Sequence, residues 1–362
     1  MRIGIEGNLR NNGLLRKHLP ARSALQLLLS IEWKYYTNLI LSSQGQKNKM
    51  PNKEHLIVAC DFHSETVRKL DALYHTHHLW RLSPNEKNSL LTELQGKCRA
   101  AAVAAWFVDE QIYKLESIEL MSSFGVGIDI IDFKRTKTKN IRVTNTPEVL
   151  NDSVADVAMS LVLATTRNIV NADRFARSGN WSNSSFPFCR SIGGMTLGIV
   201  GLGRIGEEIA RRAVPFNMKI AYHNRREKNL PYTYYPTLTA LAKESDVLIC
   251  ALPGGEKTKK TINKDILQTL GSTGVFINIG RGSSVDETAL VEALRNNTIA
   301  AAGLDVYENE PNIPEALISM NNVVLFPHIG SSTVETRRAM GNLVLDNLAA
   351  FFANKPLLTE VS

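Results

Sequence analysis

A glycine-rich turn between a strand and a helix constrains this chain more than any other feature. Residues 196–200 are short, apolar and β-branched, which predicts a buried strand, and residues 207–213 have the composition of a helix. Gly201, Gly203 and Gly206 lie between them in the spacing Gly-x-Gly-x-x-Gly. The first glycine permits a tight turn, the second lets backbone approach a pyrophosphate, and the third lets the helix pack close to the strand. Because the helix start also offers free N–H groups to phosphates, the segment predicts a dinucleotide site.

The next strand is expected at residues 218–223, and the residues that follow it indicate which dinucleotide is bound. A site for NAD usually carries Asp or Glu there, which binds the ribose hydroxyls. This chain has Asn224, Arg225 and Arg226, with Lys228 close behind. A carboxylate would repel a 2′-phosphate, whereas guanidinium groups attract it and bind it in a bidentate way. We therefore expect NADP(H) to be preferred, with NAD(H) possible; the alternative interpretation is a solvated basic turn.

Length and composition favour a two-domain intracellular protein. A chain of 362 residues can bury a large core, and it has no run of eighteen or more apolar residues, so we expect no membrane span. Residues 1–49 carry six of the seven net positive charges, which leaves the rest close to neutral, and we expect no nucleic-acid partner. The cysteines are scattered without a Cys-x-x-Cys pair, which favours reduced thiols in packing roles. They are Cys60, Cys98, Cys189 and Cys250.

The first 49 residues do not resemble the start of an α/β fold. They are basic, poor in acidic residues and end in a polar run, and Met50 follows them. Three interpretations stay open: a start codon assigned too early, with Met50 as the natural start; a transit peptide to an organelle; or a helical appendage, because residues 21–41 are fairly apolar. We expect a cytoplasmic protein, or an organellar one if these residues are a transit peptide.

Short apolar strands alternate with helical segments along the rest of the chain. Alternation at this spacing predicts parallel, doubly wound sheets in an α/β fold. In the part that ends at Pro147, strands are expected at 56–60, 74–80, 100–105, 118–122 and 141–144, and helices near 64–72, 84–95 and 109–115. Beyond residue 224, strands are expected at 246–251, 274–279, 300–306 and 323–326.

Residues 153–166 form an expected helix that is apolar on nearly all of its faces. Such a helix is buried, either between domains or against a second subunit. We interpret it as the first hinge and as an element of a dimer. A loop at 179–187, with Trp181 and Phe186, then leads into the strand at 196.

Two features of the first part have competing interpretations. His75, His77 and His78 could be a metal cluster, but no cysteine or paired carboxylate lies beside them in sequence, so we expect a strand and its turn and no metal site. Val126 and Gly127, in the run Phe124-Gly125-Val126-Gly127, follow an apolar strand. Backbone N–H groups there would lie at the carboxyl edge of a sheet, where an anion such as a carboxylate can bind; an ordinary turn is the alternative.

Three loops at the carboxyl edge of the second expected sheet supply Arg281, Glu310 and His328. Each lies just beyond a parallel strand, so the fold would gather them at the nicotinamide end of the cofactor. Hydride transfer to a carbonyl leaves an alkoxide, and a histidine can donate the proton that it needs. A carboxylate beside the imidazole fixes its tautomer and favours its charged form, and a guanidinium can hold a substrate carboxylate or carbonyl. The joint placement predicts a catalytic site.

These motifs resemble those of the D-isomer-specific 2-hydroxyacid dehydrogenases. Gly280-Arg281-Gly282 resembles the arginine motif of that family, residues 303–311 resemble its glutamate motif, and Pro327-His328-Ile329-Gly330 resembles its histidine motif. The resemblance runs from about residue 56 to residue 352 and leaves residues 1–49 outside.

The resemblance implies a role for each matching residue. His328 would be the proton donor with Glu310 behind it, and Arg281 would bind the substrate with the backbone of Val126 and Gly127. Asp305 would hydrogen-bond the nicotinamide amide. The cofactor would contact Gly201, Gly203, Arg204, Ile205, Gly206, Asn224, Arg225, Arg226, Leu252, Pro253, Thr258, Ile279, Asp305 and Gly330.

The resemblance also implies the architecture. A Rossmann cofactor domain of residues 148–330 would be inserted in a flavodoxin-like substrate domain of residues 50–147 and 331–362. A helix at 334–353 would return to the substrate domain. Members of the family are usually homodimers through the cofactor domain.

Within the family, the arginine pair and the expected absence of a C-terminal regulatory domain resemble the NADPH-dependent glyoxylate and hydroxypyruvate reductases. We expect reduction of small 2-keto acids to D-2-hydroxy acids. An NAD-dependent D-2-hydroxyacid or phosphoglycerate dehydrogenase and a nucleotide-gated, corepressor-like binding protein stay open as alternatives. Formate dehydrogenases are disfavoured, because they carry glutamine where this chain has Glu310. Trp106, Phe107 and Trp181 are candidates to line the substrate pocket.

Overall fold

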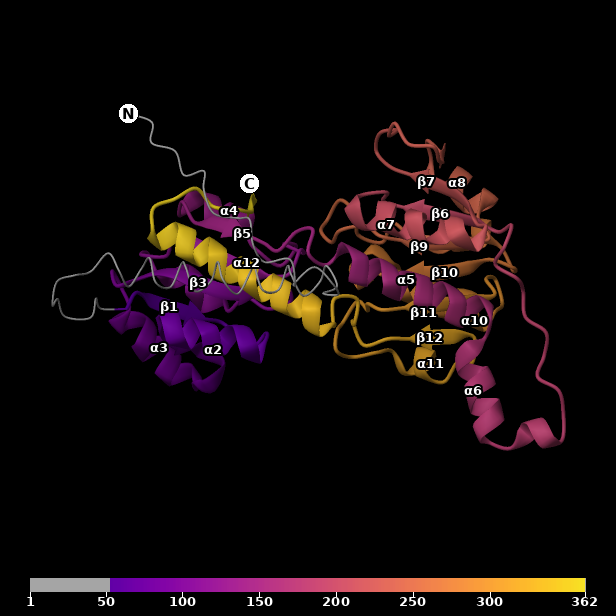
Figure 1. The fold of residues 1–362 in the computed structure, drawn as a ribbon, viewed down its shortest axis with the longest axis horizontal. Helices are drawn as coiled ribbons and strands as arrows, with labels where there is room; N and C mark the ends of the chain where they lie inside the picture. The colour runs from indigo at the N-terminus through magenta and orange to yellow at the C-terminus, as the bar shows by residue number, and fades with distance from the viewer. Residues whose placement is uncertain (1–52, 362) are drawn as a thin grey trace, which may run out of the picture. The chain divides into compact units, whose positions relative to one another are not determined.

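The computed structural model describes residues 53–361, which form two twisted β-sheets with helices on both faces of each (Figure 1). The predicted α/β class, with two parallel-sheet domains, is confirmed. Our expectations for residues 1–49 and for a start at Met50 fall outside the described residues.

The first sheet has the strand order β13-β5-β4-β3-β1-β2, and all of its pairs are parallel except the one that β13 makes. The five strands that we predicted for this part of the chain are present, although the strand expected at 74–80 ends early in a 3₁₀ turn, η1 (Leu79–Arg81). The closing strand β13 was not predicted. The strands are β1 (His55–Val58), β2 (His75–His78), β3 (Cys98–Ala104), β4 (Leu120–Phe124), β5 (Arg142–Thr144) and β13 (Glu360–Val361).

Local sequence explains where the helices of this sheet begin. α3 (Pro84–Glu93) starts at a capping box in which Ser83 and Glu86 each bond the other's backbone N–H, and Pro84 occupies its first position. The helix expected at 109–115 is a 3₁₀ helix, η2 (Glu110–Lys114), capped by Asp109. The other helices of this part are α2 (Ser64–Leu73), as expected, and α4 (Phe133–Thr138), which was not predicted.

The second sheet is entirely parallel, with the order β12-β11-β10-β9-β6-β7-β8. Its direction of winding reverses between β6 and β9, and ligands of such sheets bind in the crevice at that point. The short edge strand β8 was not predicted. The strands are β6 (Thr196–Val200), β7 (Lys219–His223), β8 (Thr233–Tyr234), β9 (Val247–Cys250), β10 (Val275–Asn278), β11 (Ala301–Leu304) and β12 (Val323–Leu325). The helices and 3₁₀ turns between them are α7 (Arg204–Ala213), η4 (Val214–Phe216), α8 (Leu238–Glu244), α9 (Lys264–Leu270), η5 (Gly282–Ser284), α10 (Glu287–Arg295) and α11 (Glu315–Ile318).

Two long helices mark where the chain leaves the first sheet and where it returns. α5 (Asn151–Thr166) follows β5 and packs on α7 and on strands β10 and β11 of the second sheet. α12 (Val334–Phe352) follows β12 and packs on α2 and β4 of the first sheet, as Figure 1 shows in yellow. The second sheet is therefore an insertion in the first.

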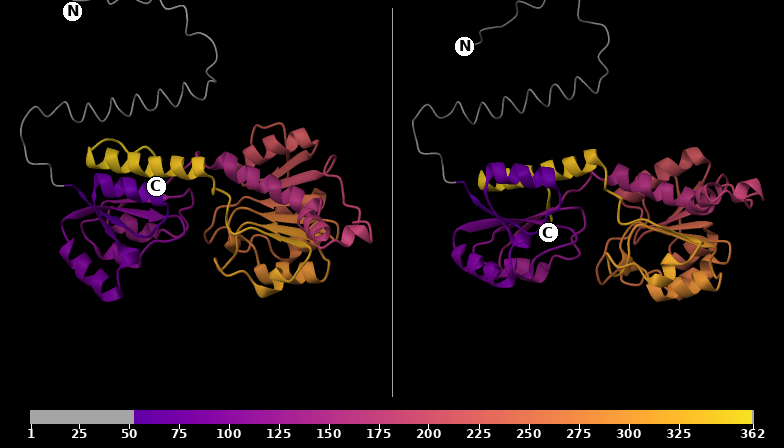
Figure 2. Two further views of the ribbon diagram at one scale, coloured as in Figure 1. Left: turned by 60° about the horizontal axis from the view of Figure 1, so that its bottom comes forward. Right: turned by 90° about the horizontal axis from the view of Figure 1, so that it is seen from below.

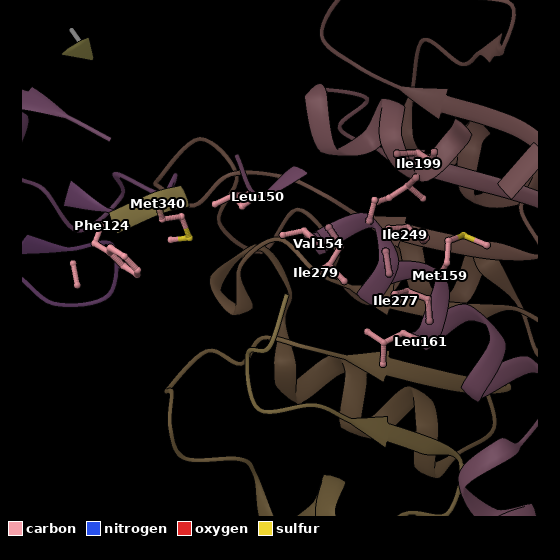
Figure 3. Packing of buried hydrophobic residues seen from close by; sticks show 14 of the residues in the cluster. Phe124, Leu150, Val154, Met159, Leu161, Ile199, Ile249, Ile277, Ile279 and Met340 are labelled. Carbon is pink, nitrogen blue, oxygen red and sulfur yellow. The ribbon is translucent and has the colours of Figure 1, made fainter. Parts of the chain in front are cut away.

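The core contacts of α5 are made within its own chain. Figure 3 shows its side chains Val154, Met159 and Leu161 in one cluster with the strand residues Ile249 and Ile277. All five are buried. Most of the apolar side chains of this helix are thus covered by the second sheet and α7.

The segment before β6 presents apolar side chains to solvent. α6 (Ile169–Arg177), which was not predicted, and the 3₁₀ turn η3 (Asn180–Ser182), within the expected loop, lie at the periphery of the second sheet in both views of Figure 2. Trp181 is 74% exposed, and Ile169 and Phe188 are also exposed.

In the part of the chain that the structure describes, no single helix is both long and apolar enough to cross a membrane. The adjoining helices α5 and α6, which are bent by 61° relative to each other, meet the length and composition criteria only as a pair.

Candidate active site

Loops after the strands of the second sheet bring His328 and Glu310 into direct contact. The His328 Nδ1 atom lies 2.7 Å from Glu310 Oε2, and the backbone N–H of Tyr307 donates to Glu310 Oε1 at 3.0 Å. A carboxylate on Nδ1 fixes the orientation of an imidazole and leaves Nε2 free for another partner. The pair therefore has the arrangement of a proton donor held by a carboxylate.

The environment of Glu310 keeps it ionised. Burial alone would raise the pKa of this carboxyl, but the hydrogen bond and charge of His328, the Tyr307 N–H and the charge of Arg281 lower it. The net result is a pKa below the ordinary glutamate value. At neutral pH the group is a carboxylate, which stabilises a proton on the neighbouring imidazole.

The backbone of His328 is held in an uncommon conformation by Asp305. His328 has a φ of +53°, in the left-handed region that most residues avoid. The buried Asp305 carboxylate accepts the next two backbone N–H groups, from Ile329 at 2.7 Å and from Gly330 at 2.9 Å. Ser153, on α5, donates to the Gly330 carbonyl at 2.7 Å. Strained backbone at a functional site persists only where the surroundings fix it, and here they do.

Burial raises the pKa of Asp305, against the opposing influence of its two backbone hydrogen bonds and of the His328 charge. The resemblance assigned this carboxylate to the nicotinamide amide. Both of its oxygens already hold the His328 loop, although each retains a second lone pair that can accept a further bond. We infer that Asp305 is at least a positioning residue for the histidine.

Arg281 is presented by a loop that Asn278 shapes. Asn278 ends β10 and is buried; its amide donates to the Arg281 carbonyl at 3.0 Å, and its side-chain oxygen accepts the Gly280 N–H at 3.1 Å. The guanidinium then reaches Asp129, with Nε 3.2 Å from Oδ1. It also lies so close to Gly127 that a Cβ there would be 1.6 Å from Nη2. The structure thus brings together Arg281 and the Gly127 loop, which sequence analysis had placed in one site.

The Val126–Gly127 loop is anchored at the end of β4. The Asn145 amide donates to the Val126 carbonyl at 2.9 Å, and the Gly125 N–H donates to Thr146 Oγ1 at 3.1 Å. Asn145 and Thr146 therefore position the Val126–Gly127 loop. Asp129 was missed by sequence analysis, although an acidic residue just after a glycine turn at the carboxyl edge was the available signal.

A cationic side chain that sequence analysis did not identify lies among aromatic residues at the same edge of the first sheet. Arg337, on α12, lies over the rings of Trp106 and Phe124, with its Cζ 5.5 and 5.6 Å from their centroids. Burial lowers the pKa of this guanidinium, which donates a hydrogen bond to the Ser332 hydroxyl at 3.0 Å. Of the aromatic residues suggested to line the pocket, Trp106 is here, Phe107 closes the turn after β3, and Trp181 lies in η3.

The glycine motif has the geometry that a pyrophosphate requires. Gly201 has a φ of +93°, and a Cβ on it would lie 3.0 Å from the Ala251 carbonyl. A Cβ on Gly206 would lie 2.7 Å from the Gly201 carbonyl, whereas a Cβ on Gly203 would have no atom of residues 53–361 within 4 Å apart from its own chain neighbours. Arg204 and the half-buried Ile205 form the first turn of α7, where the helix offers its free N–H groups. The open side of Gly203 therefore fits a phosphate.

The residues after β7 differ sharply in their contacts. The Asn224 side chain accepts the Leu202 N–H at 2.7 Å, so it supports the glycine loop. Lys228 pairs with Glu207. Arg225 and Arg226 are exposed, and within residues 53–361 neither forms an ion pair. Two unneutralised guanidinium groups are consequently available at the position where a 2′-phosphate would lie.

The remaining predicted cofactor residues lie on neighbouring loops. Leu252 lies between the glycine loops, because Cβ atoms on Gly201 and Gly280 would meet its side chain and its backbone. The Thr258 hydroxyl closes its own loop by donating to the Pro253 carbonyl at 2.7 Å. Ile279 is buried directly after β10.

Substitution of Gly203 and of Gly206 should affect different properties of the protein. Gly203→Ala places its Cβ in open space, so the free energy of unfolding should stay the same while dinucleotide affinity falls, because a methyl group occupies the pyrophosphate position. Gly206→Ala forces a Cβ against backbone, so it should lower stability by roughly 1–3 kcal/mol. Thermal unfolding and fluorescence titration of the dinucleotide measure both. Equal losses of stability in the two variants would contradict this assignment.

Comparison with known proteins agrees with this geometry. Residues 159–330 match the model of the D-isomer specific 2-hydroxyacid dehydrogenase NAD-binding domain. The chain is 43% identical over 309 residues to a glyoxylate/hydroxypyruvate reductase of Arabidopsis thaliana, covering 84% of this chain and 98% of that one. It is 42% identical over 313 residues to a hydroxyphenylpyruvate reductase of Plectranthus scutellarioides, with the same two coverages.

A solved structure is similar over the same length. The NADPH-dependent glyoxylate/hydroxypyruvate reductase of Sinorhizobium meliloti, in complex with NADP and malonate, has a TM-score of 0.79 and 41% sequence identity, with 86% of this chain and 97% of that chain covered. The identity and coverage of these relatives agree with the second sheet inserted in the first and with the loops that carry Arg281, Glu310 and His328. The chain belongs to the D-isomer-specific 2-hydroxyacid dehydrogenase family.

Proposed function

We propose that this protein reduces small 2-keto acids, glyoxylate and hydroxypyruvate among them, to D-2-hydroxy acids with NADPH. The observation that carries the proposal is the His328–Glu310 pair, which lies with Arg281 on the carboxyl-edge loops of a dinucleotide-binding sheet. The names of the Arabidopsis and Sinorhizobium relatives support the substrate class, and the latter supports the cofactor.

The site residues divide the work of a carbonyl reduction between them. Bound nicotinamide supplies the hydride. Arg281 and the backbone of Gly127 hold the substrate carboxylate, so the keto group is fixed relative to His328. As negative charge develops on the keto oxygen, the His328 Nε2–H donates its proton, and Glu310 stabilises the imidazolium until that moment.

Asp129 has a defined place in this scheme. Its carboxylate is an ion-pair partner of Arg281, at 3.2 Å. A substrate carboxylate offers the same chemistry to the same guanidinium, so the two compete for it. Substrate binding then exchanges one carboxylate for another, with the guanidinium neutralised throughout.

Single replacements of His328 and Glu310 should distinguish the loss of the proton donor from the loss of the carboxylate that positions it. His328→Gln should lower kcat for hydroxypyruvate by about 10²–10⁴-fold, because it removes the proton donor. Glu310→Gln should lower kcat less, because the proton donor remains and only the carboxylate that fixes its orientation is lost. Initial rates of NADPH oxidation at saturating hydroxypyruvate measure both effects. Full hydroxypyruvate reduction by His328→Gln would disprove the mechanism.

The cofactor preference depends on Arg225 and Arg226, which form no ion pair with another residue of the described range 53–361. Arg225→Asp should raise the KM for NADPH at least about tenfold, because a hydrogen bond to a charged group contributes about 1.5–3 kcal/mol. The KM for NADH should not rise. Arg295→Asp makes the same change of charge at the C-terminal end of α10 and serves as the matched control. An unchanged NADPH KM in Arg225→Asp would show that the basic turn is merely solvated.

The full chain should be assayed with NADPH and NADH against glyoxylate, hydroxypyruvate, pyruvate and phenylpyruvate in parallel. Turnover of the first two with NADPH supports the proposal. Turnover with NADH alone would favour an NAD-dependent D-2-hydroxyacid dehydrogenase. Tight NADPH binding without turnover of any of the four would favour either an unusual substrate or the corepressor-like alternative.

We infer that the protein acts as a homodimer. The exposed apolar side chains of residues 169–188, which include Ile169, Trp181 and Phe188, support a partner surface on the cofactor domain. Sedimentation equilibrium of the full chain should give twice the mass of one chain, and Trp181→Ser should raise the monomer fraction. A wild-type protein with the mass of a single chain would contradict the inference.

We propose a reducing compartment, the cytoplasm or an organelle. All four cysteines are free. Burial raises the pKa of the Cys60 thiol to about 12, where Asp61 adds to the effect, and that of Cys98 to about 11, so both thiols stay protonated at neutral pH. Such thiols act as packing groups and support a setting without disulfides. Neither a nucleic acid nor a membrane is part of the proposed function; localisation of a fluorescent fusion of the full chain tests the compartment.

A further inference from the structure

Three histidines gather on one face of the first sheet, away from the active site. His55 is the first residue of β1, and His75 is the first residue of β2, its direct partner in the ladder. His77 lies two residues further along β2, opposite Ile57. Because side chains alternate across a strand, His55, His75 and His77 all project from the face that carries Ile57. We refer to these three residues as the histidine triad.

The rings of the histidine triad are close enough to share one ion. Ring centroids are 4.8 Å apart for His55 and His75, 5.1 Å for His55 and His77, and 4.9 Å for His75 and His77. His55 Nδ1 lies 2.9 Å from His77 Nε2, and one ring nitrogen from each of the three residues lies within 4.8 Å of the others. Three nitrogens bound tetrahedrally to zinc at about 2.0–2.1 Å are roughly 3.3 Å apart, so small ring rotations suffice.

We propose that His55, His75 and His77 form a binding site for a divalent transition-metal ion of the zinc type. Imidazole nitrogen suits zinc, copper and nickel. Three protein nitrogens supply three of the four ligands of a tetrahedral ion and leave the fourth position open. His75 is exposed and the other two are half-buried, so an ion can enter from solvent. The ion replaces the His55–His77 hydrogen bond, and a water molecule completes the shell.

The surroundings of the triad both favour and oppose a cation. Burial and the neighbouring histidines lower the pKa of His77 to about 4, and burial also lowers that of His55, so both rings are neutral and have lone pairs to offer at neutral pH. The carboxylates of Glu93 and Glu54 add favourable negative charge. Lys97 acts against them. The short distances within the triad, rather than the net charge, carry the proposal.

The position of the triad predicts what the ion does. Among the strands that the structure describes, β2 lies at the edge of the first sheet and pairs with β1. The triad lies on β1 and β2 near their amino ends, beside α3 (indigo in Figure 1), whereas the Val126–Gly127 loop follows the carboxyl end of β4. An ion here links the edge strand to β1 without touching the reaction. Ligands that bind only the folded chain stabilise it, so metal should raise the unfolding temperature and leave kcat unchanged.

The test uses tag-free, full-length protein stripped of metal with a chelator. Zinc is titrated by calorimetry and cobalt by its visible absorption, whose intensity reports tetrahedral coordination. His75→Gln and His77→Gln each remove a ligand. His78→Asn is the matched control, because His78 lies on the same strand, projects from the opposite face and bonds Asp71. Cys189→Ser controls for zinc on the exposed thiol.

We expect one zinc ion per chain, with affinity at least about tenfold weaker in His75→Gln and His77→Gln than in the wild type. His78→Asn and Cys189→Ser should bind as the wild type does. Zinc should raise the unfolding temperature of the wild type and not that of the two ligand variants. Because His75 is exposed, His75→Gln tests the site without threatening the fold. Absence of zinc binding by the wild type, or equal binding by all variants, would overturn the proposal, and so would an equal loss in His78→Asn. Reductase activity of the metal-free chain tests the proposed function separately.

Discussion

The two hydrogen bonds that Asp305 accepts from Ile329 and Gly330 support the whole candidate site. They hold His328 in a left-handed conformation in which its Nδ1 meets Glu310. Without them the backbone would relax to a commoner region, and the imidazole would turn away from its carboxylate. A buried carboxylate is costly unless it is hydrogen-bonded, and these bonds also satisfy Asp305. The geometry of the proton donor and the stability of the buried charge therefore depend on the same two contacts.

Close backbone approach is the second constraint on the site. A Cβ on Gly280 would meet the Leu252 carbonyl at 2.4 Å, and one on Gly282 would meet the Tyr307 carbonyl carbon at 1.8 Å. The loops after β9, β10 and β11 are thus stacked backbone against backbone. This stacking lets side chains from separate loops converge, because no side chain separates the loops that carry them. Glycine in the arginine motif is needed for packing as much as arginine is needed for charge.

Charge is distributed unevenly over the site. Arg281 is matched by Asp129, and Lys228 by Glu207, whereas Arg225 and Arg226 have no acidic partner within residues 53–361. A guanidinium that has a carboxylate partner attracts a further anion less strongly than one without, because the carboxylate offsets part of its charge. The 2′-phosphate end of the site should therefore attract anions more strongly than the Arg281 end. Arg337, half-buried beside the rings of Trp106 and Phe124, adds a further cation at the substrate end.

Much of the molecule could be read from local patterns. Strand β6, the glycine turn and α7 follow from periodicity and spacing, and most strand boundaries agree within one or two residues. The family prediction, which depended on several motifs in one order, is confirmed. The short elements α4, β8 and β13 escaped prediction, because pieces of two to six residues have too little periodicity to register. α6 was missed as well, since none of its residues is buried.

The sequence by itself determined the two parallel sheets, the dinucleotide loop and the identity of Arg281, Glu310 and His328, because these depend on spacing along the chain. Only the tertiary structure decided which residues that are distant along the chain come into contact. It paired Asp129 with Arg281 from 152 residues away and placed Arg337 against Trp106. The pairing of β1 with β2 also places His55 beside His75 and His77, so that three potential metal ligands lie together where one strand alone has two. The physical reason is that parallel strands align residues that are distant in sequence, and no local pattern records which strands become neighbours.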